Sequence, residues 1–199
     1  MFAAAARITR AVEVPVSVDA ESGYGLAAAE LAGRLREAGA AGCNIEDTLH
    51  GANRPPAGDG EPARALAAAE DQAERIGALR DADGDLVINA RADVFGDGAL
   101  PGASDEERLD EAVKRAHAYL GAGADSVFVI GVAEESLITT LVDRIPGPVN
   151  VLYRPGMPSL ARLGELGVAR VTFGPGLHRA TMSLLGRLAD KLHSGAEPY

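Results

Sequence analysis

Residues 86–130 read LVINARADVFGDGALPGASDEERLDEAVKRAHAYLGAGADSVFVI, and this stretch decides the fold. Its two ends, at 86–90 and 126–130, are short runs rich in β-branched residues, which is typical of buried strands. Between them, Ser104 and Glu107 have the spacing of a capping box and predict a helix that continues to Leu120. A strand, a helix and a second strand in this order predict two parallel strands joined by a crossover helix.

The same alternation continues through the rest of the chain. Short apolar runs are each followed by a stretch of helical periodicity, and helices end in similar phrases such as Ala38-Gly39-Ala40 and Ala122-Gly123-Ala124. A helix at 3–12 enters the first strand. We expect the other strands at 15–18, 42–45, 148–152 and 170–173, and the other helices at 26–38, 63–80, 134–143, 159–165 and 177–193.

This pattern predicts an α/β protein with a parallel sheet of about six strands. A doubly wound sheet and a barrel both fit the alternation, but no dinucleotide-type glycine fingerprint follows the first strand, which favours the barrel. A complete (β/α)8 TIM barrel usually needs roughly 250 residues, and this chain has 199. We expect a single domain, residues 1–199, that forms an incomplete (β/α)8 TIM barrel of about six βα units, truncated at its N-terminal end.

The composition excludes several classes of protein. A formal net charge of −10 argues against nucleic acid or an anionic membrane as a partner, because such binders need a basic face. No apolar run approaches the roughly 20 residues of a membrane span and no signal peptide is visible, so we expect a cytoplasmic protein. A single cysteine, Cys43, excludes an intramolecular disulfide, and strand alternation relative to Glu46 turns Cys43 away from the barrel interior.

Acidic side chains gather at the ends of two successive predicted strands. Asp19 and Glu21 follow the first strand, and Glu46 and Asp47 follow the second. Arg91 follows the third. In a parallel barrel these strand ends meet at one rim, where unpaired carboxylates would repel one another. A bound cation relieves that repulsion, and Mg²⁺ prefers a few carboxylates together with water and substrate oxygens. With the guanidinium of Arg91 beside the carboxylates, the pattern predicts an anionic substrate that chelates Mg²⁺. The alternative is that the acidic residues are solvated loop residues or helix caps.

Three segments at these strand ends read Val18-Asp19-Ala20-Glu21-Ser22-Gly23-Tyr24-Gly25, Asn44-Ile45-Glu46-Asp47 and Ile88-Asn89-Ala90-Arg91-Ala92-Asp93. In this order and spacing they resemble motifs of the isocitrate lyase/phosphoenolpyruvate mutase superfamily: Asp-x-Asp/Glu-x-Gly-Tyr-Gly, a Glu-Asp strand and Ala-Arg-x-Asp. The resemblance covers essentially the whole chain. It implies a (β/α)8 barrel, Mg²⁺ dependence, and the making or breaking of a C–C or P–C bond next to an α-keto acid or its enolate.

The activity implied by the resemblance is that of a lyase or hydrolase. It would cleave a C–C bond in a small α-keto or α-hydroxy di- or tricarboxylate through a metal-stabilised enolate. Two alternatives stay open: a P–C bond mutase or hydrolase acting on phosphonopyruvate, and a non-catalytic fragment or pseudoenzyme. Members of the superfamily often form homotetramers with exchanged C-terminal helices, which implies a homo-oligomer in which residues 177–193 pack on a neighbour.

The resemblance also implies which residues hold the metal and the substrate. Asp19 corresponds to a direct Mg²⁺ ligand, and Glu21 and Glu46 hold the ion directly or through water. Arg91 corresponds to the residue that binds the substrate carboxylate, which makes it a catalytic as well as a substrate-binding candidate.

Further substrate-binding candidates follow from the same motifs. Gly23, Tyr24 and Gly25 shape the turn around the site. Asn150 lies on a strand whose counterpart in the superfamily faces the barrel interior.

The loop after the second strand departs from the superfamily pattern. Lyases of the superfamily carry a Lys-Lys-Cys-Gly-His loop there, whereas residues 48–54 read TLHGANR. His50 or Asn53 could replace the missing groups as an acid/base or orienting residue, and the alternative for His50 is an exposed loop imidazole. The only two lysines, Lys114 and Lys191, lie in predicted helices, which argues against a Schiff-base mechanism.

Overall fold

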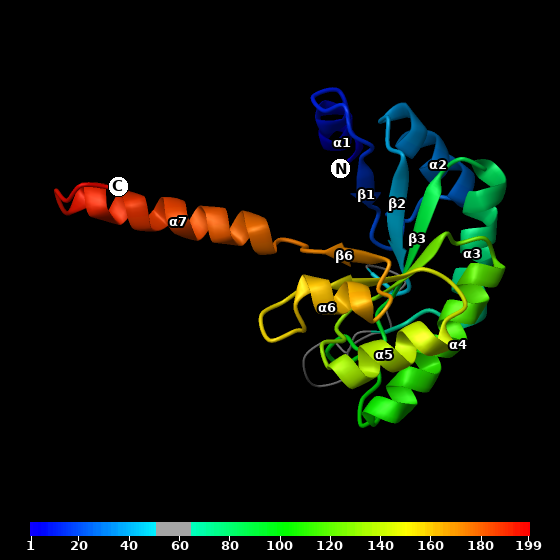
Figure 1. Cartoon of the computed structure of the whole chain (residues 1–199). Helices are drawn as coiled ribbons and strands as arrows, with labels where there is room; N and C mark the ends of the chain where they lie inside the picture. Colours follow the sequence, from blue (N-terminus) through cyan, green and yellow to red (C-terminus); the bar gives the residue numbers. More distant parts are fainter. Residues whose placement is uncertain (51–64) are drawn as a thin grey trace, which may run out of the picture.

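The protein is built on a single parallel sheet. The computed structural model describes residues 1–50 and 65–199, and in these the six strands lie side by side in chain order (Figure 1). The strands are β1 (Ser17–Asp19), β2 (Gly42–Glu46), β3 (Val87–Ala92), β4 (Ser126–Val129), β5 (Val149–Leu152) and β6 (Arg170–Thr172). Each of them lies within two residues of its predicted position.

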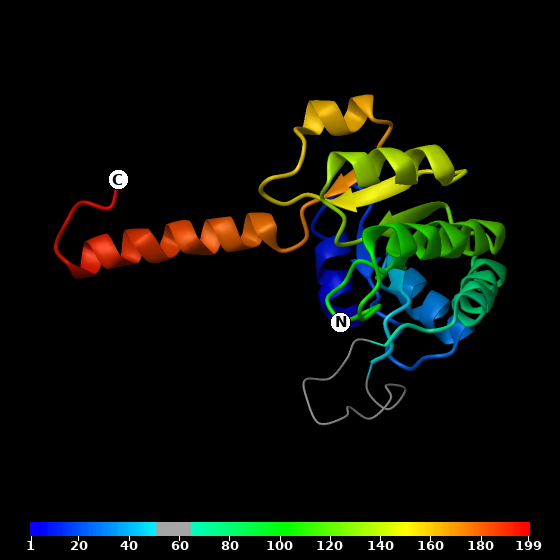
Figure 2. The same ribbon diagram turned by 90° about the horizontal axis from the view of Figure 1, so that it is seen from below.

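Helices connect the strands and follow one another around the outside of the sheet (Figure 2). They are α1 (Phe2–Thr9), α2 (Ala28–Glu37), α3 (Ala69–Ala82), α4 (Asp105–Gly121), α5 (Glu135–Arg144), α6 (Leu160–Glu165) and α7 (Gly176–His193). The sheet curls into a half-barrel whose open edges, within the described residues, are β1 and β6. The predicted incomplete TIM-barrel fold is therefore confirmed.

The two faces of the curled sheet differ in polarity. Outward side chains such as Cys43, Ile88 and Val127 are fully buried against the helices, where they form the hydrophobic core. The inward face is polar: Asn89 donates a hydrogen bond to Asn44 across 2.7 Å and accepts one from the Ser126 hydroxyl at 2.6 Å. Cys43 is thus a core side chain, as its offset from Glu46 predicts, and its burial raises the pKa of the thiol to about 12.

A local sequence signal explains where α4 begins, whereas a contact between distant residues determines where α3 begins. At α4, the Ser104 hydroxyl accepts from the Glu107 amide while the Glu107 carboxylate accepts from the Ser104 amide, so the predicted capping box is present. The predicted start of the third helix at residue 63 is wrong for residues 65–68, because Leu66 pairs with Thr48 in an antiparallel bridge and α3 begins only at Ala69. Asn53 and the first two residues of the predicted helix, 63 and 64, lie outside the described residues.

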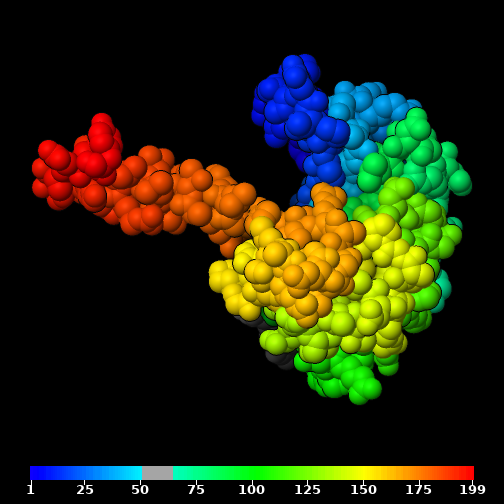
Figure 3. Space-filling view, viewed as in Figure 1, coloured from blue at the N-terminus to red at the C-terminus, as the bar shows by residue number. Residues whose placement is uncertain are grey.

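The last helix differs from all the others. Helix α7 extends away from the half-barrel as a separate arm and buries none of its residues (Figures 1 and 3). Within residues 1–50 and 65–199, no helix combines the length and apolar character needed to cross a lipid bilayer.

Candidate functional site

The register of the sheet brings the predicted site residues of the first three strands to one rim. Asp19 pairs with Asn44, and Glu46 pairs with Arg91, so their side chains share the inward face near the carboxyl ends of the strands. An ion pair of 2.5 Å between Arg91 Nη1 and Glu46 Oε2 links the side chains of β2 and β3. The structure thus brings Glu46 and Arg91 together, with Asp19 on the same inward face of the neighbouring strand.

The Arg91–Glu46 ion pair is largely shielded from water. The side chains are 14% and 5% exposed, and the second Glu46 oxygen, Oε1, is in contact with Nε2 of the half-exposed His50. Burial raises the pKa of the Glu46 carboxyl, although the His50 hydrogen bond and the Arg91 charge act in the opposite direction. Burial would lower the pKa of Arg91, but the carboxylates of Asp93 and Glu46 outweigh it and raise that pKa, so the guanidinium stays charged.

The turn after β1 has an unusual backbone. Glu21 and Tyr24 adopt positive φ angles of 48° and 55°, a region that non-glycine residues rarely occupy. Gly23 has a φ of 87°, which favours glycine, and a Cβ at this position would displace the Arg75 guanidinium from α3. Such strain is concentrated at functional sites, and the Glu21 carbonyl accepts from the Glu46 amide at 2.9 Å, which ties the turn to the ion pair.

Tyr24 covers this turn from the outside. Its hydroxyl donates to the Asp19 carbonyl across 3.3 Å. Burial, followed by the charge of Glu21, raises its pKa to about 12, so the phenol is protonated and can donate a hydrogen bond at neutral pH.

The carboxylates of the predicted metal site do not form a preformed cluster of ligands among the described residues. In the part of the chain that the structure describes, no three Asp, Glu, His or Cys side chains lie close enough to hold an ion together. Glu46 uses its two oxygens on His50 and Arg91, whereas Asp19 takes part in no ion pair among the same residues. Because Mg²⁺ commonly takes one or two protein carboxylates and fills its shell with water and substrate oxygens, this donor set fits an ion held directly by Asp19.

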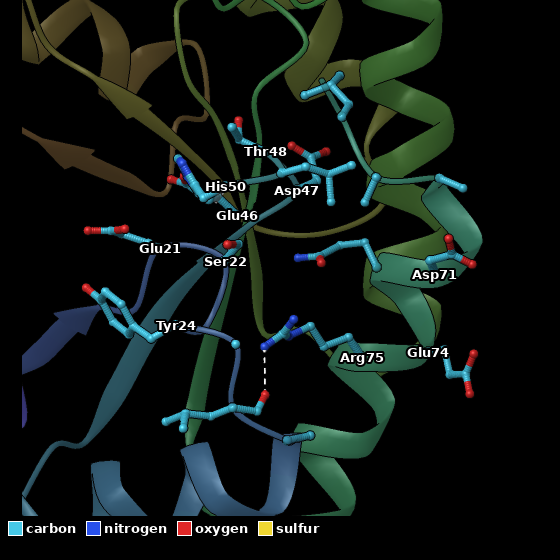
Figure 4. Close-up of a pocket in the computed structure, with 18 of the residues that line it drawn as sticks. Glu21, Ser22, Tyr24, Glu46, Asp47, Thr48, His50, Asp71, Glu74 and Arg75 are labelled. Carbon is cyan, nitrogen blue, oxygen red and sulfur yellow. Dashed lines mark hydrogen bonds and ion pairs between the residues drawn. The ribbon is translucent and has the colours of Figure 1, made fainter. Parts of the chain in front are cut away.

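A cavity of about 920 Å³ opens beside the rim (Figure 4). In Figure 4, Glu21 and Tyr24 lie on one side of Glu46 and His50, and Arg75 lies on the other. Of the predicted site residues, the cavity wall includes Glu21, Tyr24, Gly25, Glu46 and His50 but not Asp19, Gly23, Arg91 or Asn150. The cavity therefore borders Glu46 and His50 but not Arg91, and much of its wall comes from the turn after β1 and from α3.

Among the described residues, the side-chain amide of Asn150 on β5 has no hydrogen-bond partner. It is fully buried on β5, and neither its Nδ2 nor its Oδ1 atom makes a hydrogen bond with the described residues. The register links it through Phe128 to Arg91, so Asn150 belongs to the same inward row as the ion pair. An unsatisfied buried amide is costly, and a site for a polar ligand is a physical reason to keep one.

The sequence did not reveal the groups that support the ion pair. Asp93 is fully buried, and its Oδ1 accepts from Arg91 Nε at 2.7 Å. Asp47 turns its carboxylate away from the metal-site acids and toward Arg115 and Tyr119 of α4. Asp93 stands in the Ala-Arg-x-Asp segment, so its position in the motif was a signal, whereas nothing local marks Arg115 as buried.

A family model described as phosphoenolpyruvate phosphomutase matches residues 1–193. The chain therefore belongs to this family, within the isocitrate lyase/phosphoenolpyruvate mutase superfamily, and the resemblance found in the three motifs is confirmed.

Individual relatives agree with this membership. Oxaloacetate decarboxylase of Rhodopseudomonas palustris (strain TIE-1) is 40% identical over 197 residues, covering 96% of this chain and 64% of that protein. 2-Methylisocitrate lyase of Escherichia coli (strain K12) is 36% identical over 148 residues, covering 72% and 46%. A crystal structure from Burkholderia cenocepacia J2315, of a protein provisionally assigned as a phosphonomutase, superposes with a TM-score of 0.82 at 38% identity, covering 98% of this chain and 75% of that one. The chain thus spans less than two thirds of the length of the two curated relatives.

Proposed function

We propose that this chain is a Mg²⁺-dependent cytoplasmic enzyme that cleaves a C–C bond in a small α-keto or α-hydroxy di- or tricarboxylate. The observation that carries the proposal is the shielded Arg91–Glu46 ion pair. It lies at the rim of the sheet where β1 ends at Asp19 and is followed by Glu21. The similarity to an oxaloacetate decarboxylase and a 2-methylisocitrate lyase supports the same class of reaction.

In this proposal Arg91 binds the substrate carboxylate. Its guanidinium is charged, planar and held on two sides by carboxylates, so it can present its remaining N–H donors to an anion in a fixed direction. Asn150, in the same inward row, offers one donor and one acceptor to the substrate. Gly23, Tyr24 and Gly25 shape the neighbouring wall, where the Tyr24 hydroxyl remains a donor at neutral pH.

The metal would be held by Asp19 directly, with Glu21 and Glu46 acting directly or through water. When bound, a Mg²⁺ ion supplies positive charge that stabilises the enolate oxygen formed as the C–C bond breaks. His50 is the candidate proton carrier: its Nε2 contacts Glu46, which can hold the ring in one orientation beside the cavity. The contact with Glu46 supports this role for His50 over that of an isolated surface imidazole.

A second candidate function is P–C bond chemistry on phosphonopyruvate. It is favoured by the family match and by the structural similarity to the Burkholderia protein assigned as a phosphonomutase. Arg91 and a bound metal ion suit a phosphonate as well as a carboxylate, so the two candidate functions are distinguished by which substrate the protein turns over.

The test measures turnover of oxaloacetate, methylisocitrate and phosphonopyruvate by the purified protein with and without Mg²⁺. We expect Mg²⁺-dependent turnover of one of the first two, and a loss of roughly 100-fold or more in Asp19→Asn because a directly bound carboxylate is removed. Calorimetry with Mg²⁺ and oxalate, an enolpyruvate mimic, should show the same loss of binding.

Asp143→Asn is the matched control, since Asp143 is an exposed carboxylate on α5. It should leave turnover and oxalate binding unchanged. Activity on phosphonopyruvate alone would select the second candidate, and a folded protein that neither binds Mg²⁺ with oxalate nor turns over any compound would leave the non-catalytic alternative.

The proposal includes a homo-oligomer, a tetramer by family resemblance, assembled through α7. Leu177, Leu184 and Leu192 lie at helical spacing on one side of this helix and are 65%, 49% and 61% exposed. An apolar stripe of this length on an isolated helix indicates a protein contact.

We expect the wild-type protein to elute as a multimer and the double variant Leu184→Glu/Leu192→Glu as a monomer in size-exclusion chromatography with light scattering. Two buried glutamates would each have to be desolvated in the contact, which disfavours assembly. Arg179→Ala, an exposed residue on the opposite side of α7, is the control and should remain multimeric. A monomeric wild-type protein would rule out this part of the proposal.

A further inference from the structure

Beneath the Arg91 guanidinium lies a buried carboxylate that the proposed reaction does not use. The Asp93 side chain is fully buried; its Oδ1 accepts from Arg91 Nε at 2.7 Å, and its Oδ2 accepts from the Thr48 hydroxyl. Arg91 Nη1 reaches Glu46 at the same time. Holding Nε on one side and Nη1 on the other fixes both the position and the rotation of the guanidinium plane.

Asp93 is itself held by a second layer of groups. Its backbone amide donates to Asp47 Oδ1 at 2.9 Å. The other oxygen of Asp47 accepts from Arg115 Nη1 at 2.9 Å and from the Tyr119 hydroxyl at 2.7 Å. Arg115 and Tyr119 lie one turn apart on α4 and are 6% and 0% exposed, so this helix is tied to the end of β3 through one carboxylate.

The α4 side chains also reach the chain just before α3. Arg115 Nη1 donates to the Ala67 carbonyl at 2.9 Å, and the Ala67 amide donates to the Asp47 carbonyl at 2.8 Å. The Asp47 amide in turn donates to the Arg91 carbonyl at 3.3 Å. The same few atoms therefore fix the strand ends of both β2 and β3, which carry Glu46 and Arg91.

We infer that Asp93 is a positioning residue that orients the Arg91 guanidinium toward the substrate, and that Arg115 and Tyr119 act through Asp47 to hold Asp93 in place. The inference rests on the proposed role of Arg91 as the carboxylate-binding residue. Asp93, Arg115 and Tyr119 do not line the cavity beside the rim, and Asp47 lines it but uses its carboxylate on Arg115, Tyr119 and the Asp93 amide, so these residues act on the substrate through Arg91 and not by contact.

The chemistry of the cluster supports a role in geometry. Ion pairs buried this deeply add little stability compared with apolar side chains of the same size, because their charges must be desolvated. What they provide is direction: an arginine has several rotatable bonds, and a misplacement of about 1 Å at a substrate-binding group costs up to roughly 100-fold in rate. A carboxylate on Nε removes that freedom before the substrate arrives.

The experiment is a double-mutant cycle between Asp93→Asn and Arg91→Lys, read by oxalate affinity with Mg²⁺ and by KM and kcat. In the wild-type background, Asp93→Asn should weaken oxalate binding about 10-fold and raise KM by a similar factor. In the Arg91→Lys background, which has no Nε–H to hold, it should have little further effect. Tyr119→Phe should give the same direction of change with a smaller size.

A purely structural role predicts a different outcome. Ile138→Val in the α5 core is the control for lost stability and should lower the melting temperature with unchanged oxalate affinity. If Asp93→Asn lowers only the melting temperature, or weakens oxalate binding equally in both backgrounds, the inference is wrong.

A second measurement separates this inference from the proposed function. The Arg91 Nε–H signal in ¹⁵N NMR, assigned by its loss in Arg91→Lys, should exchange slowly with solvent in the wild-type protein and at least 10-fold faster in Asp93→Asn. That result would support the positioning of Arg91 even if the wild-type protein bound no oxalate. Unchanged exchange would overturn it, whatever the activity.

Discussion

Replacing Arg91 with methionine is expected to abolish turnover and to destabilise the protein by roughly 3–5 kcal/mol. The stability loss arises because Glu46 and Asp93, 4% and 0% exposed, would be left as buried carboxylates without their shared guanidinium. Arg91→Lys keeps one charge but cannot span both acids, so kcat/KM should fall roughly 1,000-fold, or about 4 kcal/mol of transition-state stabilisation. Steady-state kinetics and urea unfolding of both variants check these values.

The stability loss in Arg91→Met should depend on pH in a defined direction. Without the arginine, the folded-state pKa of the Glu46 carboxyl rises further above its unfolded value, because burial already raises it and the opposing Arg91 charge is removed. The part of the destabilisation due to Glu46 is then largest above that folded-state pKa and shrinks as the pH falls through it and the acid becomes neutral. Urea unfolding between pH 7.5 and 5 should show the difference from wild type decreasing.

An exposed ion pair offers the control for this prediction. Arg144 and Asp110 are 2.8 Å apart with side chains 43% and 61% exposed, and such pairs contribute roughly 0–1 kcal/mol. Arg144→Met should therefore change stability little at any pH. An Arg91→Met protein as stable as wild type, or equally destabilised at pH 5 and 7.5, would show that Arg91 does not compensate the charge of the buried carboxylates.

The strands and most helices were predictable because their signals are local. The runs at 86–90 and 126–130 are apolar enough to identify strands, and the Ser104–Glu107 box fixes the start of α4. The start of α3 was not predictable from the sequence, because the pairing of Thr48 with Leu66 competes with the helix and joins residues far apart in the chain. Helical periodicity over 177–193 predicted α7 but gave no indication that it extends away from the body.

Of the contacts in the candidate site, only the one between Glu46 and Arg91 was predictable from the sequence. Strand ends of a parallel barrel meet at one rim, so the meeting of Glu46 and Arg91 followed from their places after successive strands. Asp47 directly follows Glu46 at the same strand end, but strand alternation turns it to the helix side, where it meets Arg115. Arg115 lies among charged residues of a long helix and reads as solvent-exposed, since the partner that explains its burial is 68 positions away.

The same inner face contains two fully buried asparagines in opposite situations. Asn89 is hydrogen-bonded to Asn44 and Ser126, whereas both amide atoms of Asn150 lack a partner among the described residues. Since sequence alone cannot distinguish a satisfied amide from an unsatisfied one, the assignment of Asn150 to the substrate rested on resemblance. The structure adds a physical criterion that can be measured: a ligand-binding amide lowers the stability of the free protein, and a structural amide raises it.

Replacing Asn150 with leucine is therefore expected to stabilise the free protein while it lowers activity. Leucine has a similar volume and removes an unsatisfied buried amide, which should add roughly 1–3 kcal/mol to the free energy of unfolding, or about 2–4 °C of melting temperature per kcal/mol. Turnover and oxalate affinity should fall roughly 100-fold, because the substrate loses a donor and an acceptor. Thermal unfolding and kinetics on the same preparation measure both effects.

Asn89→Leu is the matched control, with the same residue type, the same complete burial and the same face of the sheet. It deprives Asn44 and Ser126 of their partner and should destabilise the protein by about 2 kcal/mol or more. Opposite signs for the two variants would establish that Asn150 is kept for the ligand, since only a group that acts in the complex can be unfavourable without it. If Asn150→Leu destabilises the protein as Asn89→Leu does, the amide serves the fold and the substrate contact has to be assigned elsewhere on the inner face.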